Sequence, residues 1–140
     1  LARQNSNIQV YEDGLESRDF VYIDDVIDAT FSSIDHQDTY VGAMNVGSGV
    51  ATSVIDVATL IKSYFNSDST ITIGGEFRIG DIRHNIADIS LIHDLLGYVP
   101  RTTFVDGLNK FLSWAEREPV SDKSAYSASV NELSERGLMG

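Results

Sequence analysis

The sequence has 140 residues, of which 42% are hydrophobic, enough for one core. None of them is cysteine, which excludes a disulfide framework, a zinc–thiolate site and a cysteine nucleophile. Ten Lys and Arg residues against 21 Asp and Glu residues give a net charge of −11, the wrong sign for binding nucleic acid. No apolar run approaches the roughly 18 residues that span a bilayer. We therefore expect a cytoplasmic chain that binds neither nucleic acid nor membrane. Because it begins at Leu1 rather than Met, we expect a piece of a longer protein.

The first 35 residues predict two strands and a helix. Residues 8–10 and 20–23 are β-prone and are separated by the turn-like composition of residues 12–14, which predicts a hairpin or two adjacent strands. The apolar spacing that follows predicts a helix with Asp24 or Asp25 as N-cap and its end near Asp35.

The middle of the chain continues this alternation. Residues 43–46 predict a short strand that runs into the turn Gly47-Ser48-Gly49. Ser53 and Asp56 have the spacing of a capping box and open a helix over residues 54–65. The β-branched run 69–73 predicts a further strand.

Three more helices are expected toward the C-terminus. The first is capped by Asp88 and ends at Gly97, and the second opens at the capping-box pair Thr103 and Asp106. A last short helix, capped by Ser129 and Glu132, would close at Gly137. Alternating strands and helices predict an α/β fold.

Few side chains suggest a site by residue type alone. His36, His84 and His93 fall in different elements without carboxylates at ligand spacing, so we expect no metal site. The turn Gly47-Ser48-Gly49 has the context of a phosphate-binding turn, but position 52 is Thr and the third glycine of the dinucleotide fingerprint is missing. A tight strand-to-helix turn is the simpler interpretation.

The loop arginines leave two interpretations open. Arg18 lies beside Asp19 at the start of a predicted strand, and Arg78 and Arg83 flank Gly80-Asp81. Planar guanidinium groups that converge on one crevice would suit a diphosphate. Ordinary salt bridges with the abundant carboxylates are the alternative.

Several motifs together resemble a known family. They are 10–14 (VYEDG), 17–26 (SRDFVYIDDV), 45–49 (NVGSG), 78–84 (RIGDIRH), 87–90 (ADIS) and 95–100 (LLGYVP). In order and spacing they are similar to the C-terminal part of NAD-dependent nucleoside-diphosphate-sugar epimerases and dehydratases, the extended short-chain dehydrogenase/reductase family. The resemblance covers residues 8–118.

The resemblance implies a small mixed α/β substrate-binding lobe over residues 1–119, followed by a tail, 120–140, with a possible short helix. In that family NAD and the catalytic Tyr-x-x-x-Lys belong to an N-terminal Rossmann domain, through which the enzymes usually dimerise. No tyrosine of this sequence is followed four residues later by Lys. The resemblance therefore implies that this chain binds no NAD, holds no catalytic residue and is inactive alone.

The resemblance also implies which residues contact the substrate, a UDP- or dTDP-sugar. Arg18 and Arg78 match the two arginines that contact the pyrophosphate, and Asp81 matches an acidic residue near the ribose. Val10 and Tyr11 align with the strand that lies against the base.

A further position departs from the family pattern. Phe20 occupies a substrate-binding position that is often Tyr, so a hydroxyl contact there would be lost.

Two other functions remain open. The chain could be a stand-alone nucleotide-sugar-binding or regulatory module that lost catalysis. It could also be an acidic protein-interaction domain without a small-molecule ligand.

Overall fold

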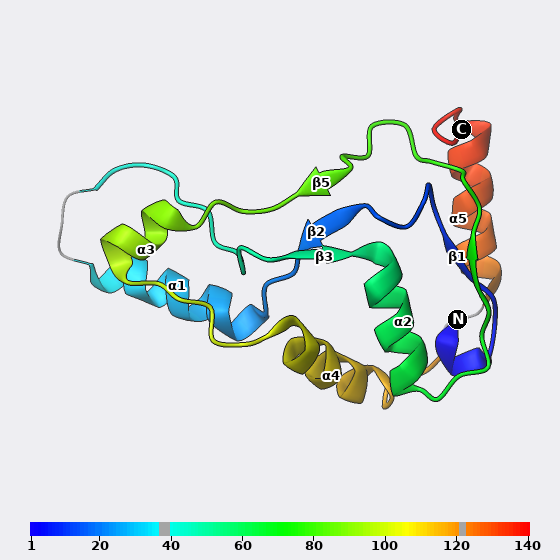
Figure 1. Cartoon of the computed structure of the whole chain (residues 1–140), viewed down its shortest axis with the longest axis horizontal. Helices are drawn as coiled ribbons and strands as arrows, with labels where there is room; N and C mark the ends of the chain where they lie inside the picture. Colours follow the sequence, from blue (N-terminus) through cyan, green and yellow to red (C-terminus); the bar gives the residue numbers. More distant parts are fainter. Residues whose placement is uncertain (37–39, 121–122) are drawn as a thin grey trace. The chain divides into compact units, whose positions relative to one another are not determined.

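The computed structural model describes residues 1–36, 40–120 and 123–140 (Figure 1). They form two compact units: unit 1 comprises residues 1–16, 53–83 and 111–140, and unit 2 comprises residues 17–52 and 84–110. The elements in chain order are the 3-10 helix Ala2–Gln4, β1 (Ile8–Val10), β2 (Ser17–Asp19), α1 (Ile23–Asp35), β3 (Ala51–Ser53), α2 (Val54–Tyr64), β4 (Ile71–Ile73), β5 (His84–Asn85), α3 (Ser90–Leu96), α4 (Phe104–Ala115) and α5 (Lys123–Glu135). The prediction of a mixed α/β fold is confirmed.

Unit 1 is built on a parallel pair of strands. β1 pairs with β4 in the register Ile8↔Ile71, and Val10 at the end of β1 is only 2% exposed. The predicted hairpin is therefore wrong, because the partner of β1 lies some 60 residues later in the sequence. Gly14 turns the chain after β1 with a φ of +77°, where an added Cβ would lie 3.1 Å from Val10.

The helices of unit 1 are fixed by polar caps. Ser53 accepts a hydrogen bond from the backbone N–H of Asp56 at the start of α2, which confirms the predicted cap. Near the C-terminal end of α4, the guanidinium of Arg3 donates to the carbonyls of Ala115 (2.6 Å), Glu116 (3.0 Å) and Glu118 (3.0 Å). A cation there meets the negative end of the helix dipole.

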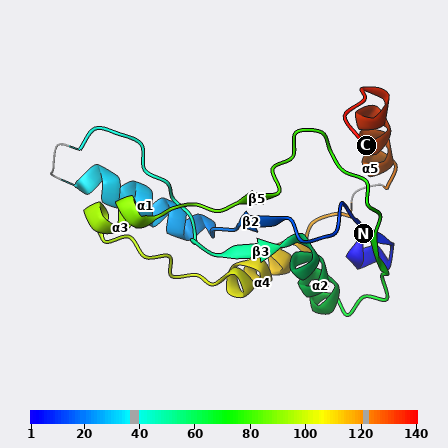
Figure 2. The same cartoon turned by 45° about the horizontal axis from the view of Figure 1, so that its top comes forward.

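Unit 2 contains the sheet β3-β2-β5, with Ser53 at its boundary, and the two helices α1 and α3. These helices lie side by side in both views (Figure 1, Figure 2). Ala29 of α1, Ile92 of α3 and Tyr98 form the buried core, against which Met44 and Val46 pack.

The start of α1 differs from the prediction. β2 covers residues 17–19 rather than 20–23, because α1 already begins at Ile23. The N-cap residue is Tyr22 and makes no side-chain cap bond. The carboxylate of Asp25 instead accepts the backbone N–H groups of Arg101 (3.0 Å) and Thr102 (3.1 Å), so it ties α1 to the segment that precedes α4.

Other predicted elements are confirmed or shifted. The helix opened by Thr103 and the end of α3 at Gly97, with a φ of +65°, are confirmed. Residues 43–46 form no strand, and their apolar side chains pack against the core instead. The N-cap of α3 is Ile89 rather than the predicted Asp88. The carboxylate of Asp88 accepts a hydrogen bond from the N–H of Ser90.

The last helix is longer than predicted. α5 begins at Lys123, ahead of the expected caps. In the described part of the chain, no helix combines the length and the apolar character needed to cross a membrane.

Candidate functional site

The predicted site residues are divided between the units. Unit 2 holds Arg18 and Phe20, and unit 1 holds Val10, Tyr11, Arg78 and Asp81.

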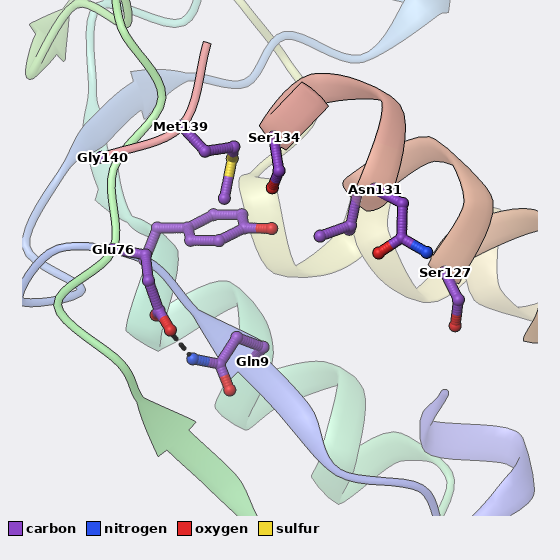
Figure 3. A pocket seen from close by; sticks show the side chains of 9 residues that line it. Gln9, Glu76, Ser127, Asn131, Ser134, Met139 and Gly140 are labelled. Atoms are coloured by element: carbon purple, nitrogen blue, oxygen red, sulfur yellow. Dashed lines mark hydrogen bonds between the residues drawn. The ribbon is translucent and has the colours of Figure 1, made fainter. Parts of the chain in front are cut away.

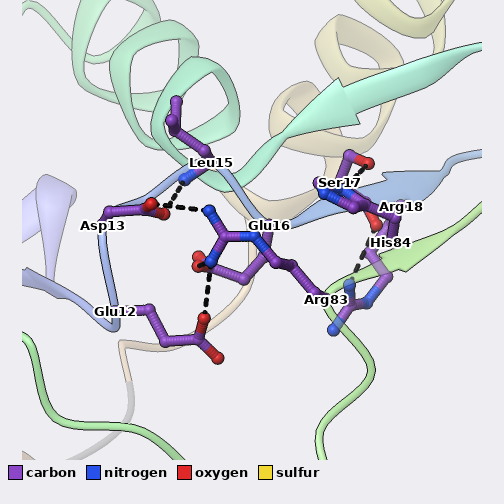
Figure 4. Close-up of polar contacts among 8 residues, drawn as sticks. All are labelled: Glu12, Asp13, Leu15, Glu16, Ser17, Arg18, Arg83 and His84. Carbon is purple, nitrogen blue, oxygen red and sulfur yellow. Dashed lines mark hydrogen bonds and ion pairs between the residues drawn. The ribbon is translucent and has the colours of Figure 1, made fainter.

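Arg18 lies in the middle of β2, where parallel pairing with β5 fixes its backbone opposite Asn85. Its guanidinium donates to the carbonyl of Ser17 (2.9 Å), and the hydroxyl of Ser17 lies 2.8 Å from Nδ1 of His84 in a hydrogen bond (Figure 4). Arg18 lines a cavity of about 300 Å³ together with Asn45 and Asn85. Asp19 also lines this cavity, so one cation, one carboxylate and two amides surround a polar space.

The carboxylate of Asp19 organises the wall of this cavity. It accepts hydrogen bonds from the backbone N–H and the hydroxyl of Ser48 (2.7 and 2.6 Å), from the N–H of Gly49 (2.9 Å) and from the N–H of Ala87 (3.2 Å). Burial alone would raise the pKa of Asp19, but these hydrogen bonds lower it below its ordinary value. Asp19 therefore stays ionised and holds the turn against the end of β2.

Gly47 is required by the same close packing. An added Cβ would lie 2.5 Å from the Cβ of Ala87 and 2.6 Å from Oδ2 of Asp19, and the buried hydroxyl of Tyr98 donates to the carbonyl of Gly47 (2.9 Å). Burial, with the charges of Asp25 and Asp19, raises the pKa of the Tyr98 hydroxyl. Tyr98 is therefore a hydrogen-bond donor of the core.

The turn Gly47-Ser48-Gly49 does not fit the phosphates of a dinucleotide. The N–H groups of Ser48 and Gly49 that would face an anion are directed at Asp19. This geometry agrees with the interpretation of the turn as a structural one.

In unit 1, the structure brings three predicted site residues together. The guanidinium of Arg78 donates to Oδ2 of Asp81 from Nε (3.0 Å), with Nη2 2.7 Å from the same oxygen. The guanidinium carbon lies 5.8 Å from the centroid of the Tyr11 ring. The side chain of Arg78 is 48% exposed, so it can meet a ligand while Asp81 and Tyr11 hold its position.

The other two predicted residues have packing roles. Val10 is buried and its carbonyl accepts the N–H of Gly74. The ring of Phe20 packs on Phe104 with centroids 5.0 Å apart. Both side chains contribute shape to their units rather than a polar contact.

Arg83 is surrounded by carboxylates, a cluster that the sequence did not assign. Its guanidinium forms ion pairs with Glu12 (2.9 Å), Glu16 (3.4 Å) and Asp13 (Figure 4). The hydrogen bond from Arg83 is the main cause of the lowered pKa of Asp13, whereas burial raises the pKa of Glu16. Three acidic residues around the Gly14 turn were the signal available in the sequence. Arg83 thus stabilises this turn.

Among the described residues, no group of three or more His, Asp or Glu side chains is arranged to hold a metal ion.

The sequence and the fold both match known proteins. Residues 1–47 match the NAD dependent epimerase/dehydratase family. A dTDP-L-rhamnose 4-epimerase from Burkholderia thailandensis is 36% identical over 118 residues, which are 84% of this chain and 32% of that protein.

Two solved structures extend the comparison. The UDP-glucose 4-epimerase of Thermotoga maritima, solved with UDP-glucose, superposes with a TM-score of 0.74 at 27% identity and covers 83% of this chain and 37% of its own. A mutant UDP-glucuronic acid 4-epimerase from Bacillus cereus was solved in complex with UDP-4-deoxy-4-fluoro-glucuronic acid and NAD. It has a TM-score of 0.74 at 26% identity, and the match covers 84% of this chain and 38% of that protein. The chain spans about a third of the length of these proteins.

Proposed function

Because the chain belongs to the NAD-dependent epimerase/dehydratase family, we propose that it is the part of such an enzyme that binds the nucleotide sugar, a UDP- or dTDP-sugar. The observation that carries this proposal is the cluster of Arg78, Asp81 and Tyr11 in unit 1. Only some of the donors of Arg78 are directed at Asp81, which leaves others for phosphate oxygens. A guanidinium beside an aromatic ring suits the diphosphate and base of one nucleotide.

Arg18 is the second proposed phosphate ligand. Its strand is fixed by Asn85 on the partner strand and by the hydrogen bonds of the adjacent Asp19. Its guanidinium is already held by the carbonyl of Ser17, so it loses less conformational entropy when it binds. Binding energy at the diphosphate, remote from the reacting sugar carbon, serves to orient the sugar.

We propose that NAD is held outside these 140 residues, as in a two-part enzyme that dimerises through the other part. The sequence has no Tyr-x-x-x-Lys, and Asp19 fills the one turn that resembles a dinucleotide cradle. No catalytic step is therefore assigned to residues of this chain. NAD supplies hydride transfer in this family.

The test is to replace Arg18 and Arg78 singly with Ala in the protein expressed from its complete reading frame. A charged hydrogen bond contributes about 1.5–3 kcal/mol, so we expect the Kd for UDP, measured by calorimetry, to rise about tenfold or more in each variant. Arg101→Ala is the matched control, because this arginine is 82% exposed and pairs only loosely with Asp28, at 3.6 Å. Unchanged affinity in both test variants would overturn the proposal.

A further inference from the structure

Unit 1 contains a cavity of about 440 Å³ that is lined by Tyr11, the residue directly after β1, and by residues of α5 (Figure 3). Ser127, Asn131 and Ser134 of α5 line it, together with Met139. Their spacing along the helix places them on one face, and Figure 3 shows them on the side of α5 turned to the cavity.

The end of α5 is anchored to the segment that carries Arg78. The N–H of Gly137, with a φ of +66°, donates to the carbonyl of Ser134, and the N–H of Leu138 donates to the carbonyl of Leu133. This pair of bonds is a Schellman cap. The next residues run antiparallel to residues 77–79, with Met139 opposite Arg78. Backbone hydrogen bonds therefore anchor the end of α5 beside the cavity that Tyr11 also lines.

The walls of the cavity differ in chemistry. Gln9 donates to Glu76 (3.0 Å) and is fixed by that bond. Among the described residues, none hydrogen-bonds to the side chain of Asn131, whose amide offers a donor and an acceptor together. One cavity thus contains an aromatic ring and an amide, the groups with which proteins stack a nucleobase and bond its Watson–Crick edge.

We propose that α5 is the base-contacting helix of this nucleotide site and that Asn131 is a specificity-determining residue for uracil or thymine. The inference rests on the proposed function, which supplies the pyrimidine and its diphosphate. The imide edge of these bases presents an N–H between two carbonyls, so one amide satisfies a donor and an acceptor at once. With the base against Tyr11, the diphosphate reaches Arg78, whose guanidinium carbon is 5.8 Å from the ring centroid.

The experiment compares Asn131→Ala with the unchanged protein, both expressed from the complete reading frame, by calorimetric titration with UDP, ADP and inorganic pyrophosphate. Loss of neutral hydrogen bonds is expected to raise the Kd for UDP about three- to tenfold, to reduce the preference for UDP over ADP, and to leave the Kd for pyrophosphate unchanged. Ser129→Ala is the matched control, because this exposed serine lies on α5 but does not line the cavity. Circular dichroism checks that the helix content is kept.

Arg78→Ala separates this inference from the proposed function. This substitution should raise the Kd for UDP and for pyrophosphate alike, because it removes a phosphate contact. If Asn131→Ala leaves UDP affinity and base preference unchanged while Arg78→Ala weakens both ligands, the base assignment is wrong and the proposed function stands. If Asn131→Ala weakens the binding of pyrophosphate as much as that of UDP, the lost contact is not with the base and the inference fails. Unchanged binding in Arg78→Ala and Arg18→Ala rejects the proposed function instead.

Discussion

At the scale of single residues, Asp19 is a centre of hydrogen bonding in unit 2. Its carboxylate joins the end of β2 to a turn 29 residues later and to Ala87, 68 residues later. The adjacent Arg18 is held by this arrangement, since both residues belong to one short strand. Asp19 thus positions the proposed phosphate ligand without itself requiring contact with the substrate.

Asp19→Asn is expected to lower the free energy of unfolding at pH 7 by about 1.5–3 kcal/mol, because a charged acceptor of several hydrogen bonds is lost. Urea denaturation measures the change. Asp28→Asn is the control, since this carboxylate is 59% exposed and should contribute little. Equal stability of the two variants would show that the network around Asp19 is unimportant.

The same carboxylate predicts a pH dependence. The pKa of Asp19 is lowered in the folded state, so its stabilisation is present above its unfolded pKa, near 4, and is lost as the pH falls through the lower folded pKa. Stability of the unchanged protein should therefore fall more steeply below about pH 4 than that of Asp19→Asn. Parallel pH profiles of unfolding midpoints would contradict this assignment.

Sequence reasoning reached these residues unevenly. The resemblance selected Arg78, Tyr11 and Asp81, which the structure places together. It could not show that Asp19 fills the glycine turn, or that Arg83 serves the Gly14 turn, because both contacts join segments far apart in the sequence. Contacts between segments so far apart have no local spacing signal.

At the scale of elements, local signals predicted some helix ends and missed others, since Asp24, Asp25 and Asp88 are not N-caps. The caps at Ser53 and Thr103 and the stop at Gly97 each depend on residues within one helical turn, and all three are present. The predictions of a hairpin and of a strand at 43–46 failed, because the described strands are two or three residues long and β1 and β2 pair in parallel with strands far along the sequence. Alternation within so few residues carries little information.

Ser53→Ala tests the importance of a cap for unit 1. Removal of an N-cap side chain costs about 1 kcal/mol, which calorimetric or urea unfolding would detect. Ser63→Ala, at an exposed position of the same helix, is the matched control and should change stability by less than about 0.5 kcal/mol. A loss of similar size in both variants would point to an effect other than capping.

At the scale of the whole molecule, the chain corresponds to about a third of its relatives and divides into two units that interleave along the sequence. The fold class was predictable from alternating elements, whereas this interleaving was not, since no composition change marks residues 16, 53, 83 or 111. The division into residues 1–119 and 120–140 stays a prediction.

The last prediction concerns catalysis by the 140-residue chain itself. Its lysines are Lys62, Lys110 and Lys123, and none follows a tyrosine at the spacing of the family's catalytic pair. In the turn that resembles a dinucleotide cradle, the N–H groups of Ser48 and Gly49 donate to Asp19. We therefore expect that this chain with added NAD does not convert UDP-glucose, UDP-glucuronic acid or dTDP-L-rhamnose. Chromatography of the sugar products measures the conversion.

The UDP-glucose 4-epimerase of Thermotoga maritima is the positive control for the UDP-glucose assay. Because NAD chemistry needs a base and a bound cofactor in one site, substrate affinity alone cannot produce turnover. Product formation by the 140-residue chain would show that it carries its own catalytic groups, and its function would then no longer be binding alone.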